Sequence, residues 1–133
     1  MTSLETLPGF LVHMAAALVL LGVATWVFVR VTPTDQFALI RDGNTGVAIS
    51  TGGVVIGFAL GVASAFRYSQ NLLDAAVWGV VALAAQLLAF YVVMLLMGPK
   101  WREGFERGNV AIALFKAAVA IAVGWINAAC MAT

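Results

Sequence analysis

The sequence predicts an all-α polytopic membrane protein, with four transmembrane helices as two tandem two-helix repeats with parallel pseudo-symmetry. The first observation is composition: 63% of the 133 residues are hydrophobic and only 10% are charged, whereas soluble domains are about half apolar and about a quarter charged. The second is a set of four apolar runs of about 20 residues, the length that crosses a bilayer as a helix. The third is a charged segment, a Gly-Asn pair and a small-residue apolar run, which occur twice in that order.

Each predicted span has its own apolar run. The first covers residues 10–29 and is expected to be retained, because no Lys or Arg precedes it as a cleaved signal peptide requires. The other three cover residues 45–66, about 72–97 and 110–131. These runs are about twice as long as a barrel strand and do not alternate, so helices are expected.

The first link, residues 30–44, is predicted to contain a short amphipathic helix at the membrane interface. Thr32 is expected to N-cap it, with Pro33 at the first helical position and Asp35 at the positive end of the helix dipole. The residues that recur at helical spacing on its expected apolar face are Phe37, Ile40 and the aliphatic part of Arg41.

The other two links differ in length. Residues 98–109 carry Pro99 near the start, and Trp101 and Phe105 are expected to anchor this link at the interface. Residues 67–71 are short enough for a tight turn, so the second and third spans are predicted to be antiparallel neighbours.

The distribution of Lys and Arg at the span ends predicts the orientation. One side of the membrane has only Arg67 near the spans. The other side has Arg30, Arg41, Lys100, Arg102 and Arg107. In a bacterial inner (plasma) membrane, this places the two longer links in the cytoplasm and both termini in the periplasm.

A shift of 65 residues aligns Gly43 and Asn44 with Gly108 and Asn109 without a gap. Two helices per repeat give both halves the same orientation, so the pseudo-symmetry axis is expected along the membrane normal. The predicted organisation is one membrane domain of residues 1–133, with a first repeat over 1–66 and a second over 67–133.

The second span carries a ladder of small residues at every fourth position. Such a ladder predicts close helix packing, because small side chains let two backbones approach. The partner is open between the third span, the fourth span and another subunit. The ladder comprises Gly53, Gly57, Gly61 and Ala65.

Lys116 lies inside the fourth span, where an ionisable residue is a candidate functional group. Two interpretations stay open: the long side chain snorkels to the cytoplasmic interface, or it lines a polar interior. Tyr91 on the third span is expected at similar depth and could accept a hydrogen bond from Lys116. The helical stripe that favours the polar interior comprises Asn109, Ala113, Lys116, Ala120 and Asn127.

Asn44 and Asn109 are expected at the cytoplasmic starts of the second and fourth spans. The simpler interpretation is N-capping, and the alternative is a ligand or headgroup site at two positive helix ends. His13 is interpreted as a hydrogen-bonded histidine near the outer interface rather than a proton relay. Gln86 is expected to bond a neighbouring helix.

No enzyme is predicted, because the sequence lacks a zinc-protease, nucleophile-elbow, phosphate-loop or dinucleotide-binding motif. We therefore expect no catalytic residue, no cofactor and no metal site. Cys130 is the only cysteine and gives no metal-ligand spacing. The net charge of +1 is too small to attract nucleic acid electrostatically.

The sequence resembles the YjfL-like bacterial inner-membrane family, which is uncharacterised. The resemblance rests on residues 37–44, which read FALIRDGN, on the glycines behind them and on the echo at Gly108 and Asn109. It covers essentially the whole chain and implies two tandem two-helix repeats. It also implies an envelope-stress setting through the family's usual gene neighbours, and it supplies no catalytic residue.

Two functional hypotheses follow. The first is a structural or interaction component that offers its cytoplasmic links to a peripheral membrane protein or to anionic headgroups. The alternative is a small channel or exporter that forms a homo-oligomer, with Lys116 lining an anion path, because four short helices enclose little space. The lipid bilayer is the partner common to both hypotheses.

Overall fold

The computed structural model describes residues 6–31, 35–69, 71–98, 103–104 and 106–131. Within these residues the chain is helical, and four of its helices are long and apolar enough to cross a membrane. This confirms the predicted all-α fold with four candidate spans. The elements are α1 (Leu7–Val31), α2 (Gln36–Arg41), α3 (Thr45–Tyr68), α4 (Leu72–Met97) and α6 (Val110–Cys130).

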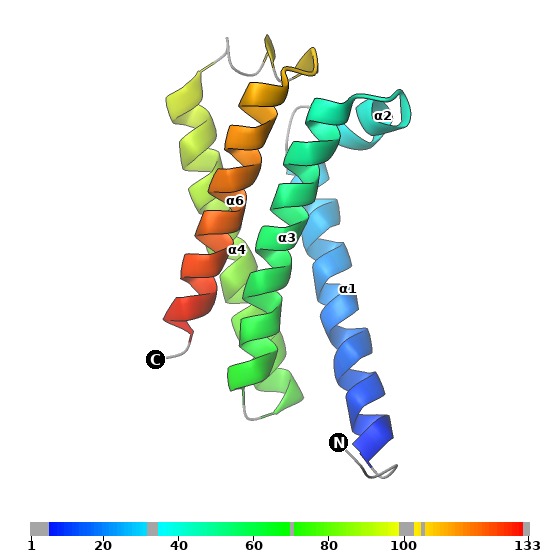
Figure 1. Cartoon of the computed structure of the whole chain (residues 1–133). Coiled ribbons are helices and arrows are strands. Elements are labelled where there is room, and N and C mark those ends of the chain that lie inside the picture. Colours follow the sequence, from blue (N-terminus) through cyan, green and yellow to red (C-terminus); the bar gives the residue numbers. More distant parts are fainter. Residues whose placement is uncertain (1–5, 32–34, 70, 99–102, 105, 132–133) are drawn as a thin grey trace.

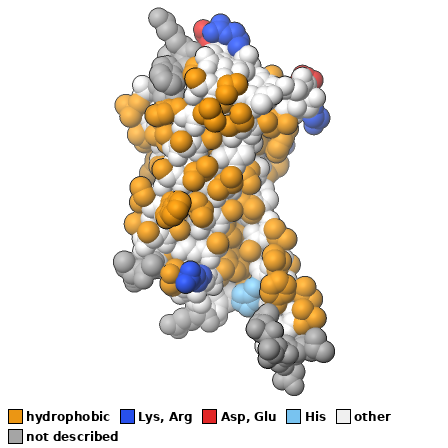
Figure 2. Space-filling view, in the orientation of Figure 1, with side chains coloured by type: hydrophobic (Ala, Val, Ile, Leu, Met, Phe, Trp, Pro, Cys, Tyr) orange, Lys and Arg blue, Asp and Glu red, His pale blue; other side chains and the backbone are white. Residues whose placement is uncertain are grey.

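The four long helices form an elongated bundle in which α3 and α6 run in one direction and α1 and α4 in the other (Figure 1). We call the end that carries α2 and the first residues of α3 and α6 the cap end. The opposite end, where α1 begins and α6 ends, is the terminus end. Figure 2 shows apolar side chains over most of one face of the bundle, with charged side chains near its two ends.

The short turn between α3 and α4 lies at the terminus end and makes these helices antiparallel neighbours, as predicted. Asn71 stabilises the start of α4, because its Oδ1 accepts a hydrogen bond from the Asp74 N–H at 2.8 Å. Ser69 closes α3, with its N–H donating to the Ala65 carbonyl at 3.2 Å. The three residues between Tyr68 and Leu72 are a sufficient connection because each helix end is satisfied locally.

The predicted first residues of α2 were wrong. Asp35 is the N-cap, and its Oδ1 accepts from the Ala38 N–H at 3.3 Å. Thr32 and Pro33 lie outside the described residues. So do Pro99, Lys100, Trp101, Arg102 and Phe105 of the longer link.

The buried face of α2 also differs from the prediction. Gln36 is buried, and Ile40 packs against Val47 and Ala113 at the starts of α3 and α6. Phe37 instead lies outward with 45% of its surface exposed. A helix that begins at Gln36 points residues three and four positions later in the same direction, so the residue next to Gln36 faces away from the bundle.

The central element is α3, which is buried over most of its length and packs most extensively against α6. A methyl group added at Gly53 would lie 2.5 Å from Cβ of Ala117, and one added at Gly57 would lie 2.5 Å from the Ala120 carbonyl oxygen. The seam between α3 and α6 therefore depends on backbone-to-backbone contact. Gly61 faces Ala82 of α4 instead, 3.3 Å from an added methyl group.

Candidate functional site: the cap end and buried Lys116

Asn44 and Asn109 occupy matching positions at the cap end. The Oδ1 of Asn44 accepts from the Val47 N–H at 3.0 Å, and the Oδ1 of Asn109 accepts from the Ile112 N–H at 3.2 Å. Each satisfies a backbone donor that has no partner inside its own helix. The structure thus gives both residues the N-cap geometry.

A glycine in the left-handed backbone region precedes each asparagine, with φ of +90° at Gly43 and +88° at Gly108. A side chain at either position would strain the backbone, whereas glycine adopts this conformation freely. Each turn is closed in the same way. The N–H of Asn44 donates to the Leu39 carbonyl and that of Asn109 to the Gly104 carbonyl, both at 2.9 Å.

A hydrogen bond joins the two cap turns, which are the turn before α3 and the turn before α6. Among the described residues, Asn109 makes no equivalent bond to the first turn. The Nδ2 of Asn44 donates to the Glu106 carbonyl at 3.0 Å. Gly46 lies against the second turn, because a methyl group there would be 3.0 Å from the carbonyl carbon of Gly108. Asn44 therefore caps its own helix and holds the turn before α6 at the same time.

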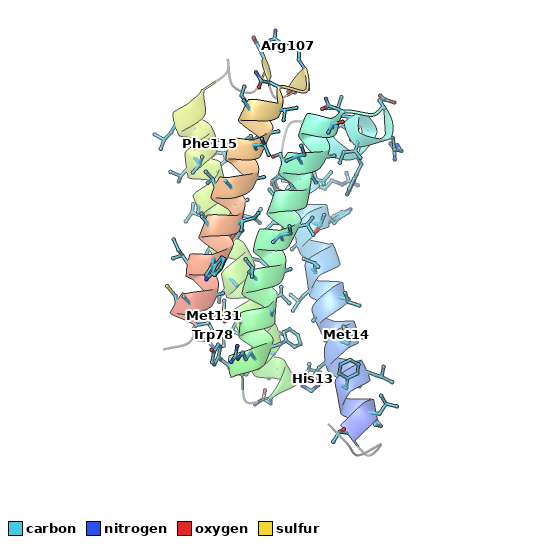
Figure 3. The ribbon with its side chains drawn as sticks, in the orientation of Figure 1. His13, Met14, Trp78, Arg107, Phe115 and Met131 are labelled. Atoms are coloured by element: carbon cyan, nitrogen blue, oxygen red, sulfur yellow. The ribbon has the colours of Figure 1, made fainter. Side chains whose placement is uncertain are left out.

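These turns surround an open, polar pocket of about 400 Å³ at the starts of α3 and α6. Asp42 and Arg107 are exposed on its rim and carry opposite charges. Figure 3 shows Arg107 at the cap end of the molecule. The lining residues are Leu39, Asp42, Gly43, Asn44, Thr45, Gly46, Arg107 and Gly108.

Lys116 is buried in the bundle, with 3% of its surface exposed. Its Nζ lies 5.7 Å from the centre of the Phe90 ring, within the range of a cation–π interaction. Phe90 packs edge-on against Phe28 at 5.4 Å between ring centres. The side chain therefore lies among protein atoms and does not extend along the lipid-facing surface.

Gln86 and Thr51 are among the other polar side chains that are buried in the described part of the bundle. The Nε2 of Gln86 donates to the Ala120 carbonyl, one turn along α6, at 2.8 Å. The Oε1 of Gln86 and the Oγ1 of Thr51 are buried and have no hydrogen-bond partner. The contact of Gly53 with Ala117 fixes the register of α3 on α6. Measured along the helix axes at 1.5 Å per residue, Thr51 and Lys116 are therefore within about 2 Å of the same position.

Tyr91 does not take the predicted place beside Lys116. Its surface is 61% exposed, whereas Phe90 is buried and faces Lys116. Consecutive residues on a helix point about 100° apart, so only one of the two can face α6. The structure therefore places Phe90, and not Tyr91, beside the Lys116 ammonium, which is against Tyr91 as the acceptor of its hydrogen bond.

Asn127 is distant from Lys116, about 16 Å further along α6 at 1.5 Å per residue. Its Nδ2 donates to the Ala82 carbonyl of α4 at 2.8 Å, which joins α6 to α4 near the terminus end. His13 is exposed on α1, with its Nδ1 2.8 Å from the Gly9 carbonyl oxygen and its ring beside Phe66 of α3 (Figure 3). The candidate residues therefore form separate groups along the bundle.

Sequence reasoning missed a polar contact across the seam between α3 and α6. The Oγ of Ser64 donates to the Ala128 carbonyl at 2.8 Å. Ser64 immediately precedes Ala65, the last member of the small-residue ladder. A serine beside such a ladder is a usable signal, because hydroxyl groups often bond across close helix pairs in membranes.

Comparisons with known proteins agree with this architecture. The chain is 30% identical over 128 residues to UPF0719 inner membrane protein YjfL of Escherichia coli strain K12, covering 96% of each chain. It is 28% identical over 109 residues to UPF0719 transmembrane protein YshE of Bacillus subtilis strain 168, covering 77% of this chain and 78% of that protein. No solved structure matches the chain significantly.

The match to YjfL covers nearly the whole of both chains, and the match to YshE covers about three quarters of each. The names of these relatives place them in membranes and state no reaction. The family model described as Domain of Unknown Function (DUF350) matches residues 1–131. The chain therefore belongs to the DUF350 family.

Proposed function

We propose that this protein is a non-enzymatic interaction component of the bacterial inner membrane, and that its cap end binds a peripheral protein. The observation that carries the proposal is the hydrogen bond from Asn44 to the Glu106 carbonyl, which joins two polar turns into one surface. Asp42 and Arg107 give this surface charges of both signs around an open pocket. A rigid, charged surface at the end of an apolar bundle suits recognition by a water-soluble partner.

The proposal includes an orientation with the cap end in the cytoplasm and both termini in the periplasm. Three described arginines support it, since Arg30, Arg41 and Arg107 lie at the ends of α1, α2 and the turn before α6. Arg67 lies at the opposite end, in the last turn of α3. Positive residues concentrate on the cytoplasmic side of inner-membrane proteins.

Site-specific photo-crosslinking in intact cells tests the surface. A photoreactive residue replaces Thr45 or Arg107 at the cap end, and Tyr68 at the terminus end provides the matched control. We expect a discrete crosslinked protein band from the two cap-end positions and none from Tyr68. The Asp42→Lys substitution, which reverses one rim charge, should reduce that band. Equal crosslinking from Tyr68 would contradict the proposal.

The envelope-stress setting, which the family resemblance implies, remains a prediction within this proposal. Under it, the yield of the cap-end crosslink should change when the membrane is depolarised by a protonophore. A constant yield, in cells whose stress response is shown to be active, would contradict the envelope-stress setting but not the proposed interaction.

A second candidate is a small oligomeric channel or exporter in which Lys116 lines an anion path. The buried ammonium supports it, because ionisable residues inside membrane proteins usually serve a function. Ion flux into liposomes, with anion-sensitive and pH-sensitive dyes, compares the wild type with Lys116→Met. The interaction proposal predicts no flux from either protein. Flux that falls in Lys116→Met would favour the channel.

A further inference from the structure

A groove runs along the outside of the α3/α6 seam at the terminus end, far from the cap-end pocket. Its volume is about 300 Å³, and it is open on one side. Because both flanking helices are membrane spans, an open groove between them faces the bilayer. The lining residues are Leu60, Ala63, Ser64, Arg67, Tyr68, Trp125, Ala128 and Ala129.

The floor of the groove is apolar although a serine lines it. The Oγ of Ser64 donates to the Ala128 carbonyl at 2.8 Å, so the hydroxyl proton is used within the seam. Ala63 and Ala129 are small and leave space above this bond. Leu60 lies at the deeper end, two turns of α3 before Arg67. The floor therefore suits a hydrocarbon chain rather than a polar ligand.

The mouth of the groove carries a positive charge. Arg67 is exposed, and its guanidinium carbon lies 5.4 Å from the centre of the Tyr68 ring. Of the described residues that line this groove, Arg67 alone is charged. Trp125 forms the other wall with 69% of its surface exposed. Tyr68 is the last residue of α3 and lies at the end of a span, where aromatic side chains lie at headgroup level.

We infer that this groove binds one acidic phospholipid, with its phosphate on Arg67 and one acyl chain against Leu60, Ala63 and Trp125. Guanidinium groups recognise phosphate oxygens with paired hydrogen bonds. The absence of a carboxylate among the described lining residues gives the groove a net positive charge. That charge favours a lipid with a net negative headgroup over a zwitterionic one.

Native mass spectrometry of the detergent-purified full chain tests the inference with two probes, phosphatidylglycerol and phosphatidylcholine. The wild type should retain one phosphatidylglycerol at lipid concentrations where phosphatidylcholine is lost. Arg67→Gln should reduce retention of phosphatidylglycerol by about tenfold, which corresponds to about 1.4 kcal/mol. Equal retention of both lipids by the wild type would overturn the assignment to an acidic lipid.

Arg30→Gln is the matched control for the charge. The Arg30 guanidinium lies 5.2 Å from the Trp26 ring centre, so it stacks on an aromatic residue as Arg67 does, but on α1 and outside the groove. Arg30→Gln should leave retention unchanged. A loss as large as that of Arg67→Gln would show that surface charge in general, and not the groove, holds the lipid, and would overturn the inference.

Ala63→Phe tests the groove itself, because a benzyl group on this exposed residue occupies the space without entering the seam. It should lower retention of phosphatidylglycerol as much as Arg67→Gln does. Ala118→Phe changes an exposed alanine of α6 that does not line the groove, and it should leave retention of phosphatidylglycerol unchanged. Thermal unfolding of each variant confirms that it is folded. Unchanged retention in folded Ala63→Phe, or a wild-type mass equal to a dimer closed over this face, would refute the lipid as occupant.

Discussion

Asn44 and Asn109 both cap a helix, but only Asn44 is seen to hold a second segment, through its bond to the Glu106 carbonyl. Loss of an N-cap costs about 1 kcal/mol, and loss of a further hydrogen bond costs about 1 kcal/mol more. We therefore expect Asn44→Ala to lower the free energy of unfolding by about twice as much as Asn109→Ala.

Thermal or SDS-induced unfolding of the purified protein, followed by circular dichroism, measures this difference. Asn71→Ala provides a control, because Asn71 caps α4 with a single bond to the Asp74 N–H. It should resemble Asn109→Ala. If the three substitutions lower stability equally, the bond between the cap turns contributes nothing to the fold.

Thr51 provides a second test at the residue scale, because its Oγ1 is buried without a partner. A buried polar atom without a hydrogen bond costs about 1–3 kcal/mol. Thr51→Val keeps the shape of the side chain and removes that atom, so we expect it to raise the unfolding midpoint. Ser64→Ala, which breaks a bond across the seam, should lower it. A destabilised Thr51→Val would indicate that the hydroxyl has a bound water as its partner.

Single residues were the hardest feature to predict from the sequence. The positions of Asn44 and Asn109 could be predicted, because capping depends on local chain geometry. Tyr91 and Phe37 could not, because their direction depends on the rotation of each helix about its axis. Gln36 and Phe90 are the adjacent residues that are buried instead, and the hydropathy pattern does not show which member of each pair faces the bundle.

Among the elements, α3 depends on glycine for its contact with α6. Gly57→Ala would put a methyl group 2.5 Å from the Ala120 carbonyl oxygen, so the helices must separate. We expect a loss of about 1–3 kcal/mol, as for other overpacked cores. Gly52→Ala is the matched control, because its added methyl group meets nothing within 4 Å. It should leave the unfolding midpoint unchanged or higher, as measured in the same detergent.

The helix boundaries could be predicted closely. The predicted 72–97 and 110–131 agree with α4 (Leu72–Met97) and α6 (Val110–Cys130) within one residue, because hydropathy determines where a span must end. The predicted 10–29 and 45–66 are shorter than α1 (Leu7–Val31) and α3 (Thr45–Tyr68) by two or three residues at three of their four ends. The partner of the small-residue ladder could not be predicted. Small residues specify a close approach but not which helix approaches, and α3 has close neighbours in both α6 and α4.

For the whole molecule, the bundle places the start of α1 and the end of α6 at the same end (Figure 1). Alkaline phosphatase and green fluorescent protein, fused in turn to the C-terminus, report its side of the membrane. With the orientation proposed above, we expect phosphatase activity and no fluorescence. A fusion inserted after Asp42 at the cap end should give the reverse. Fluorescence from the C-terminal fusion would invert the proposed orientation.

The helical bundle is observed, whereas the tandem repeat in the sequence is still a prediction. Residues 1–66 and 67–133 remain predicted repeats. The matching cap turns at Gly43 and Gly108 are compatible with them. Lys116 and Thr51, at equivalent positions in the sequence, differ in chemistry. A pattern of apolar residues cannot predict such differences, because each half has its own neighbours in the interior.

The seam between α3 and α6 has a consequence for how the protein is made. Ribosomes deliver α3 to the membrane well before α6, and the bond from Asn44 to Glu106 spans 62 residues of sequence. Until the last span is inserted, the part of the small-residue face that packs against α6, at Gly53 and Gly57, has no partner from its own chain. A nascent chain therefore passes through a stage in which its central helix is exposed to lipid, the insertion machinery and membrane proteases. Chains that stop before α6 should accordingly be degraded rather than accumulate.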